Sequence, residues 1–351
     1  MSRLKGILLA FAPASEELAV TLTGRPALAL PIANRPLARY GLEAMRACGV
    51  EELAIMVAPG AAGSGIALAE DAARLQLEPH VVETPDAGPV EALLAARDFI
   101  ADDAVLVHRA DGLVAGALAR EISAFRSEGA DMGLLVPGTD AEQDEAGALR
   151  LVTHARIPAG DDALAPAAVL GPAALGHAAA AAAAGRAPST LVALAVALRE
   201  AGGTVDVRGV VGAWSYRDEV DELLEGNRLV LDEIARDLSG VDVSQARIEG
   251  RVTIHPSAVV ERTTIRGPAV IGPGAVLVDA FVGPYTSIGE NAHLEGAELE
   301  HSIVLSGAAI RHVGRRLEAS IVGREANVHR DFELPAALRV RVGRRAEVSL
   351  A

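Results

Sequence analysis

The segment from Lys5 to Pro36, KGILLAFAPASEELAVTLTGRPALALPIANRP, decides the fold that the sequence predicts. Gly6–Ala10 is a short apolar run of the kind that forms a buried strand in a parallel sheet. In proteins that bind phosphate, a glycine-rich loop follows such a strand. Here residues 11–17 read FAPASEE, which contains no glycine and carries the carboxylates Glu16 and Glu17. The segment therefore has the frame of a nucleotide-binding strand and loop without the groups that would hold a triphosphate.

From residue 5 to about 212 the sequence alternates short apolar runs with longer helical patterns, which is typical of a mixed, mostly parallel sheet flanked by helices. We expect this α/β domain to cover residues 1–220. The predicted strands are Gly6–Ala10, Leu53–Val57, His80–Glu83, Ala104–Val107, Met132–Val136 and Val205–Val211. The predicted helices are Leu37–Gly49, Gly88–Phe99, Gly116–Gly129 and the alanine-rich His177–Gly185.

The sequence pattern changes in the rest of the chain, from about residue 220 onward. Val220–Gly240 has apolar residues at helical spacing and predicts an amphipathic linker helix within residues 221–245. From Ala246 onward, aliphatic residues recur at a period near six, with glycines close by. This repeat predicts a left-handed parallel β-helix over residues 246–351, with three hexads per coil and a C-terminal cap formed by the less regular Leu317–Ala351. The repeating aliphatic positions are Ile265, Ile271, Leu277, Ile288 and Leu294, with a slip of one residue between Leu277 and Ile288.

Composition limits the classes of function. The 351 residues carry a formal net charge of −15, so binding to nucleic acid or to an anionic membrane is not expected. One cysteine, Cys48, excludes an internal disulfide and a cysteine-rich zinc site. No apolar run of 18 residues is uninterrupted, and no leader pattern opens the chain, so we expect a cytoplasmic protein.

Several short motifs, taken together, resemble those of the sugar-nucleotide pyrophosphorylases. More narrowly, the chain resembles the long glucose-1-phosphate thymidylyltransferases, in which a nucleotidyltransferase domain precedes a hexapeptide-repeat β-helix. The resemblance covers almost the whole chain. The segments that carry it are Lys5–Ala10, Pro31–Pro36, Tyr40–Ala44, Ala96–Phe99, Trp214, Glu225–Arg228 and most of Gly267–Ile321.

The resemblance implies a reaction in which a sugar 1-phosphate attacks the α-phosphorus of a nucleoside triphosphate and releases pyrophosphate, assisted by Mg²⁺ and basic residues. At the position of the family's phosphate loop, Glu16 replaces a cation with an anion. A phosphate-binding lysine of the family falls on Ala27, with Arg25 as a nearby substitute. The base-reading glutamine falls on Glu83, and only Gly88 remains of the segment after it.

The implied metal site is also incomplete. Asp111 keeps one of the two carboxylates that would coordinate Mg²⁺, and the other position is occupied by Tyr216. Asp218, two residues later, is a possible replacement ligand. Asp111 can also be read as a loop or helix-capping residue, because Gly112 follows it. The segments of the family that contact the sugar have no clear match in this chain.

These losses lead to a pseudoenzyme hypothesis: a non-catalytic structural or regulatory subunit in nucleotide-sugar metabolism that requires no cofactor. Its expected partners are further copies of itself, bound through the β-helix, or an active nucleotidyltransferase paralogue. One alternative is an active nucleotidyltransferase that uses Mg²⁺. Another is a hexapeptide-repeat acyltransferase with His293, His301 or His312 as general base, although surface positions for these histidines are the simpler interpretation. Core packing is the simpler role for Trp214 and Cys48.

Overall fold

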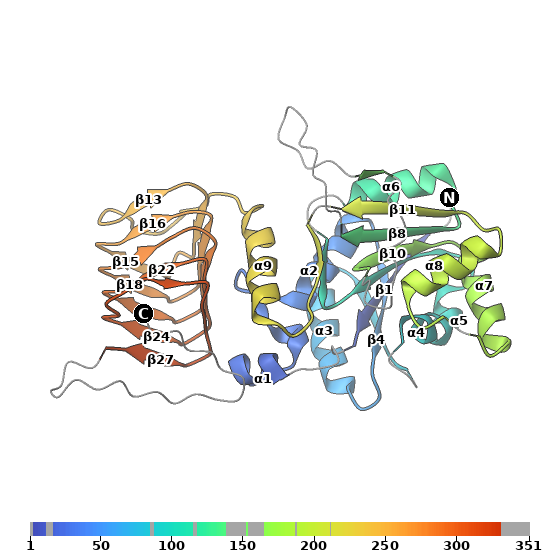
Figure 1. Ribbon diagram of the computed structural model, residues 1–351, viewed down its shortest axis with the longest axis horizontal. Coiled ribbons are helices and arrows are strands. Elements are labelled where there is room, and N and C mark those ends of the chain that lie inside the picture. Colours follow the sequence, from blue (N-terminus) through green and yellow to red (C-terminus); the bar gives the residue numbers. More distant parts are fainter. Residues whose placement is uncertain are drawn as a thin grey trace.

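The computed structural model describes residues 3–11, 17–84, 88–114, 118–137, 152–153, 165–186, 188–210 and 212–330. Within these ranges an α/β unit is followed by helix α9 (Val220–Leu231) and by a stack of short strands, which lies on the far side of α9 from the sheet (Figure 1). None of the described helices combines the length and the apolar character needed to span a bilayer.

The α/β unit is built on a mixed sheet with the strand order β5-β4-β1-β6-β10-β8-β11-β9. All six predicted strands are present, and the prediction of a mostly parallel sheet is confirmed. The antiparallel strand β10 was not predicted, because its four residues, AAVL, are too few and too rich in alanine to show a strand pattern. The strands are β1 (Leu4–Ala10), β4 (Glu52–Val57), β5 (Glu78–Glu83), β6 (Ala104–Arg109), β8 (Met132–Pro137), β9 (Val152–Thr153), β10 (Ala167–Leu170) and β11 (Val205–Val210).

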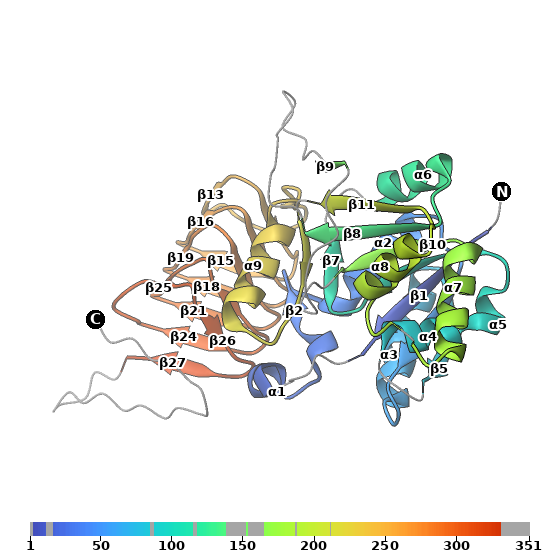
Figure 2. The ribbon, with the colours of Figure 1, turned by 45° about the vertical axis from the view of Figure 1, so that its right-hand side comes forward.

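Helices cover both faces of this sheet. Helices α2 (Leu37–Ala47), α3 (Ala62–Arg74) and α6 (Leu118–Glu128) contribute to one apolar core. The other face is covered by α4 (Pro89–Ala95), α5 (Arg97–Ile100), α7 (Pro172–Ala183) and α8 (Leu191–Glu200) (Figure 2). In place of the single helix predicted over Gly88–Phe99, the structure has two short helices, α4 and α5. The alanine-rich helix starts earlier than predicted, at Pro172, because proline is well suited to a first helical turn.

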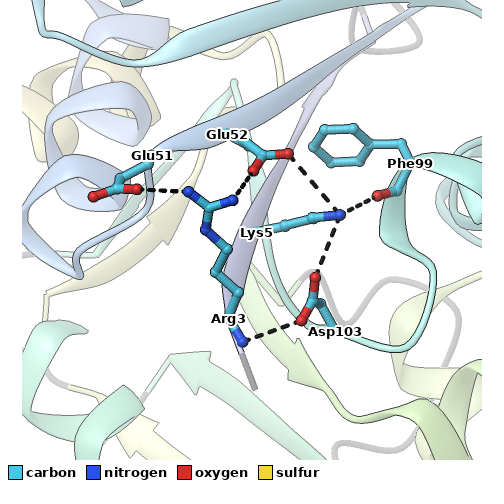
Figure 3. A network of polar contacts seen from close by, with 6 residues as sticks. All are labelled: Arg3, Lys5, Glu51, Glu52, Phe99 and Asp103. Carbon is cyan, nitrogen blue, oxygen red and sulfur yellow. Dashed lines mark hydrogen bonds and ion pairs between the residues drawn. The ribbon is translucent and has the colours of Figure 1, made fainter. Parts of the chain in front are cut away.

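A charged network closes the amino-terminal ends of β1, β4 and β6 (Figure 3). Lys5 is only 13% exposed; its Nζ donates a hydrogen bond to the carbonyl oxygen of Phe99 and lies 3.3 Å from Oδ2 of Asp103. Arg3 forms an ion pair with Glu52 in the same network. Because these contacts sit at the start of β1, Lys5 stabilises the amino edge of the sheet and is remote from the carboxyl edge, where the sequence predicts the site.

The C-terminal stack consists of three five-stranded parallel sheets. Consecutive strands fall in different sheets and every third strand is a neighbour, which is consistent with the predicted β-helix. The first sheet contains β13 (Arg247–Glu249), β16 (Thr264–Arg266), β19 (Phe281–Val282), β22 (Glu298–Glu300) and β25 (Leu317–Glu318). The second contains β14 (Val252–Ile254), β17 (Ala269–Ile271), β20 (Thr286–Ile288), β23 (Ile303–Val304) and β26 (Ile321–Val322). The third contains β15 (Val259–Glu261), β18 (Val276–Val278), β21 (His293–Glu295), β24 (Ala309–Arg311) and β27 (Asn327–His329).

The interior of the stack confirms that the repeating aliphatic residues point inward. Ile265, Leu277, Ile288 and Leu294 are fully buried, and Ile271 is 1% exposed. The repeat length differs from three full hexads: Val252 pairs with Ala269, and Ala269 with Thr286, so these partners are 17 residues apart. Each such repeat is therefore one residue shorter than three hexads, which agrees with the slip in the sequence pattern. The cap was predicted over Leu317–Ala351, but its first part continues the stack, because residues 317–330 contribute β25, β26 and β27 to the three sheets. Residues 331–351 lie outside the described residues.

A shared apolar cluster, called here the joint, connects the α/β unit to the second sheet of the stack. It includes residues of α1 (Glu17–Thr23), the 3₁₀ turn η1 (Ala27–Ala29), α9 and strands β23 and β26. Gly226 of α9 is needed there, because a Cβ at this position would lie 2.9 Å from Cδ1 of Ile32 and 3.1 Å from the ring of Trp214. The helix of α9 stops at Leu231, earlier than the predicted Val220–Gly240, because the chain then runs along the stack and Asp237 pairs with Thr253.

Polar contacts fix the orientation of the joint. The hairpin of β2 (Pro31–Ile32) and β3 (Arg35–Pro36) turns at Ala33 and Asn34, both with positive φ, as a two-residue hairpin loop requires. Asn34 Nδ2 donates to the carbonyl oxygen of Ile288 at 2.6 Å. Asn227, which is 1% exposed, accepts a hydrogen bond from Ala33 N and donates one to the carbonyl oxygen of Tyr285. The amide side chain of Asn227 thus connects three elements: the hairpin, α9 and the stack.

We expect Asn227→Ala to lower the free energy of unfolding by about 2–4 kcal/mol, because two hydrogen bonds are lost and buried backbone groups are left unpaired. Urea unfolding followed by circular dichroism measures this loss. The matched control is Asn327→Ala on the exposed end strand β27, which should change stability by less than about 0.5 kcal/mol. Equal stabilities of the two variants would contradict the assigned role of Asn227.

Candidate functional site

The carboxyl ends of β1, β4, β5 and β6 lie at one edge of the sheet, and the register aligns the predicted site positions along it. Val57 of β4 pairs with both Ala10 and Glu83, and Leu9 pairs with Arg109. Glu83 and the segment after Arg109 therefore occupy the same edge. Their strands are three positions apart, about 14 Å at the usual spacing of strands. Edges of this kind are where open α/β sheets bind their ligands.

A small two-stranded ladder brings the two implied metal positions together. Strands β7 (Gly112–Val114) and β12 (Ala213–Ser215) pair in antiparallel fashion, with Gly112 opposite Ser215. At the end of this ladder the backbone N–H of Tyr216 donates to the carbonyl oxygen of Asp111 at 2.8 Å. The structure thus places Asp111 and Tyr216 side by side.

Asp111 is held by an arginine two residues before it. Nε of Arg109 donates to Oδ1 of Asp111 at 2.9 Å, and Nη2 donates to Oδ2 at 2.6 Å. The Asp111 side chain is 1% exposed, whereas that of Arg109 is 22% exposed. This is the two-pronged geometry that makes arginine–carboxylate pairs strong, and it engages both oxygens of the carboxylate. Asp111 is therefore a member of a buried ion pair and caps no helix.

Tyr216 fills the second position with an aromatic side chain that is only 1% exposed. Its hydroxyl group donates to Oδ1 of Asp218 at 3.0 Å, and burial together with this bond raises the pKa of Tyr216 above its ordinary value. Asp218 has a positive φ and also accepts a hydrogen bond from Leu18 N at the start of α1. The carboxylate of Asp218 is thus directed to Tyr216 and α1, as a structural link between them.

The remaining predicted positions are dispersed. Ala27 is fully buried in the joint, whereas Arg25 is exposed on the turn after α1. Glu83 accepts a hydrogen bond from the backbone N–H of Gly60. Gly88 precedes α4, where a Cβ would lie 2.0 Å from a carboxylate oxygen of Glu91. Glu16 lies outside the described residues.

The residues considered for other chemistry have structural contacts. Trp214 is 6% exposed in the joint, and its Nε1 donates to Glu222 at 2.9 Å. Cys48 packs against the sheet core, and burial raises the pKa of its thiol to about 12, so it is a poor nucleophile at neutral pH.

The three histidines of the stack do not converge on one point. Nε2 of His293 is 3.4 Å and Nε2 of His312 is 3.8 Å from the carboxylate of Glu295, whereas His301 makes an edge contact with the ring of Tyr285. Among the residues with described positions, no group of three or more His, Cys, Asp or Glu side chains could hold a metal ion.

A cavity of about 380 Å³ lies between α2, β7, α6 and α9, away from the predicted site positions. Its walls are mainly aliphatic, and the charged residues among them are Arg35, Glu43 and Glu233. Asp111 and Tyr216 are not among its lining residues. The cavity and the ladder of β7 and β12 are therefore separate features, although β7 contributes to both.

The chain is similar to known proteins over most of its length. A glucose-1-phosphate thymidylyltransferase of Streptomyces griseus is 32% identical over 331 residues, which cover 91% of this chain and 93% of the relative. The chain belongs to the sugar nucleotidyltransferase family. A glucose-1-phosphate thymidylyltransferase of Streptomyces antibioticus is 29% identical, with 91% of this chain and 92% of the relative covered. The low-salt glycan biosynthesis nucleotidyltransferase Agl11 of Haloferax volcanii is 27% identical and is aligned over 99% of this chain and all of its own.

Structural comparison supports the fold of the α/β unit. A solved structure described as a glucose-1-phosphate thymidylyltransferase from Bacillus anthracis, in complex with sucrose, superposes with a TM-score of 0.51. It is 14% identical and covers 64% of this chain and 94% of its own length. A search against protein-family models gave no match.

The divalent metal that this family implies does not fit the residues present. The Asp111 carboxylate already accepts from a guanidinium, and the neighbouring position offers a neutral hydroxyl instead of a carboxylate. A divalent ion at about 4 Å from Arg109 would meet repulsion of about 4 kcal/mol per unit charge near a protein surface. Both oxygens of the Asp111 carboxylate, which the metal would need, are therefore already engaged by Arg109.

Arg109 is the residue that reasoning from sequence missed. A signal was present, because a charged residue ends the otherwise apolar run of β6, two positions before the aspartate. Residues two apart at the end of a strand lie on the same side of the chain, so their side chains can meet.

His108 is the residue next to Arg109 and is completely enclosed by the core. Its Nδ1 donates to the carbonyl oxygen of Arg109 at 2.7 Å, while Nε2 is buried without a hydrogen-bond partner. Burial is the main cause that lowers the pKa of His108 to about 4. A proton on Nε2 would place an unpaired charge in the core.

We expect the free energy of unfolding to decrease as the pH falls from about 6.5 to 4, by at most about 3 kcal/mol. The folded-state pKa of His108 lies below the unfolded-state value, so the unfolded chain binds the proton first. Urea unfolding between pH 7 and 4.5 measures the slope, and His108→Leu should reduce it. The exposed His329→Leu serves as the control. Identical slopes in the native chain and His108→Leu would contradict this assignment.

Proposed function

We propose that this protein is a catalytically inactive member of the sugar nucleotidyltransferase family that acts as a structural or regulatory subunit in nucleotide-sugar metabolism. The observation that carries the proposal is the burial of Tyr216 in the joint. The position that would supply the second metal carboxylate now contributes an aromatic ring to the contact between the α/β unit and the stack. A group that packs the joint in this way gives no charge to a phosphoryl-transfer reaction.

The distribution of family-like residues supports the same proposal. Asn34 and Asn227, which belong to motifs shared with the family, form hydrogen bonds across the joint. The phosphate-binding lysine position is Ala27, buried in the same cluster. Residues that maintain the assembly have thus been kept, whereas charged groups that would contact substrate are missing.

We also propose that the stack is a left-handed parallel β-helix beginning near residue 246, after an α/β domain of residues 1–220 and a connecting segment of residues 221–245. The threefold recurrence of strands and the buried aliphatic interior support this division. The outer face of the third sheet offers a surface for self-association, because Val259 is 44% exposed there beside the partly exposed Val276.

The second candidate function is an active glucose-1-phosphate nucleotidyltransferase. The names of the two Streptomyces relatives favour it, and Asp111 keeps one family carboxylate. Activity would require Mg²⁺ to compete with Arg109 for that carboxylate, or to bind elsewhere.

A pyrophosphate-release assay separates the two candidates. We expect no release above background when the purified chain is incubated with glucose 1-phosphate, each nucleoside triphosphate and Mg²⁺, because loss of even one preorganised charged group slows such reactions by about 10²–10³. The Streptomyces griseus enzyme serves as the positive control. Release that disappears in Asp111→Asn would establish the active alternative and remove the inactive one.

Light scattering tests the assembly role. We expect the full chain to have a mass above the 36.1 kDa of one chain, or to reach such a mass when mixed with an active relative from the same organism. Val259→Glu on the third sheet should weaken self-association at least tenfold, because it introduces a charge into an apolar contact. Val20→Glu, at a similarly exposed valine of α1, is the matched control. A monomer that binds no relative would count against a subunit role.

A further inference from the structure

We propose that Arg109 is a built-in cation that takes the place of the divalent metal, so that the buried carboxylate of Asp111 is neutralised by the chain itself. The inference rests on the proposed loss of catalysis and extends it: the fold keeps the negative charge of the old site and supplies its own positive charge. Stability of the α/β unit is then independent of divalent metal.

The hydrogen-bond geometry and the burial of Asp111 support this role for Arg109. Its guanidinium meets Asp111 through two parallel hydrogen bonds of 2.9 and 2.6 Å, with one partner fully enclosed. A surface ion pair contributes little, but removal of one partner from a buried pair leaves an uncompensated charge and is strongly destabilising. Asp111 therefore needs a cation in order to remain in the core at neutral pH.

The pair also begins a series of contacts that reaches the stack. The carbonyl oxygen of Asp111 accepts from Tyr216 N, and the hydroxyl group of Tyr216 donates to Asp218. Asp218 in turn accepts from Leu18 N of α1. At the other end of this helix the carbonyl oxygen of Leu22 accepts from Arg324 N at 2.7 Å. A guanidinium that is always charged holds the first member of this series in one position.

The test is rescue of an arginine-free variant by metal. Arg109→Leu leaves Asp111 without its cation, so we expect its unfolding midpoint to fall by about 5–10 °C. Mn²⁺ at millimolar concentration should restore most of this loss in Arg109→Leu, because the ion can then occupy the position of the guanidinium. The same Mn²⁺ should leave the midpoint of the native full-length chain unchanged after treatment with EDTA.

Two controls assign the effect to this site. Arg109→Leu combined with Asp111→Asn removes both charges and should show no response to Mn²⁺. Arg120→Leu removes an exposed arginine that pairs with Glu121 while Arg208 still pairs with the same carboxylate, so it should not respond either. Failure of Mn²⁺ to stabilise a folded Arg109→Leu chain would overturn the proposal.

Titration of the native chain keeps the proposal testable if Arg109→Leu does not fold. Stabilisation of the native chain by Mn²⁺ that is abolished in Asp111→Asn would show that metal already competes for this carboxylate, and would overturn it. The absence of such a response supports it. All of these measurements report stability. Pyrophosphate release by the native chain would disprove the proposed inactivity, whereas the response of the unfolding midpoint to Mn²⁺ tests the role of Arg109.

Discussion

The amide group of Asn227 is the contact on which the arrangement of the molecule depends. It accepts from Ala33 N in the β2–β3 hairpin and donates to Tyr285 in the stack, while its own backbone belongs to α9. Because the side chain is buried, neither bond can be exchanged for water without moving one of these elements. The hairpin also positions Asn34 for its contact with Ile288. The site at the carboxyl edge is built outward from this fixed joint.

At that edge the negative charge of Asp111 is neutralised by a side chain of the same protein, Arg109. This chain pairs Asp111 with Arg109, and the neighbouring position is occupied by Tyr216, whose neutral hydroxyl group donates to Asp218. This edge of the sheet therefore has the topology of the family, and the cation that pairs with Asp111 is a side chain of the protein itself, Arg109. The relatives at 27–32% identity align with this chain over nearly its whole length.

Much of this architecture could be predicted from the sequence, because most of the predicted strands are short, nearly continuous apolar runs and the inward residues of the stack recur regularly. Strand β10 escaped prediction, since AAVL acquires strand character only between β6 and β8. The adjacency of Asp111 and Tyr216 followed from family motifs, but the partner of each did not. Arg109 lies only two residues from Asp111, yet its choice of partner depends on burial, which a sequence pattern does not report.

The joint also determines how the molecule can come apart. Its cluster combines Leu113 and Trp214 of the α/β unit with Ile303 and Leu305 of the stack, so opening either side exposes apolar surface belonging to both. Local melting of the stack would therefore cost the neighbouring helices part of their core. We therefore expect the two units to unfold together at this boundary, so that a protease finds few partly open forms there to cleave.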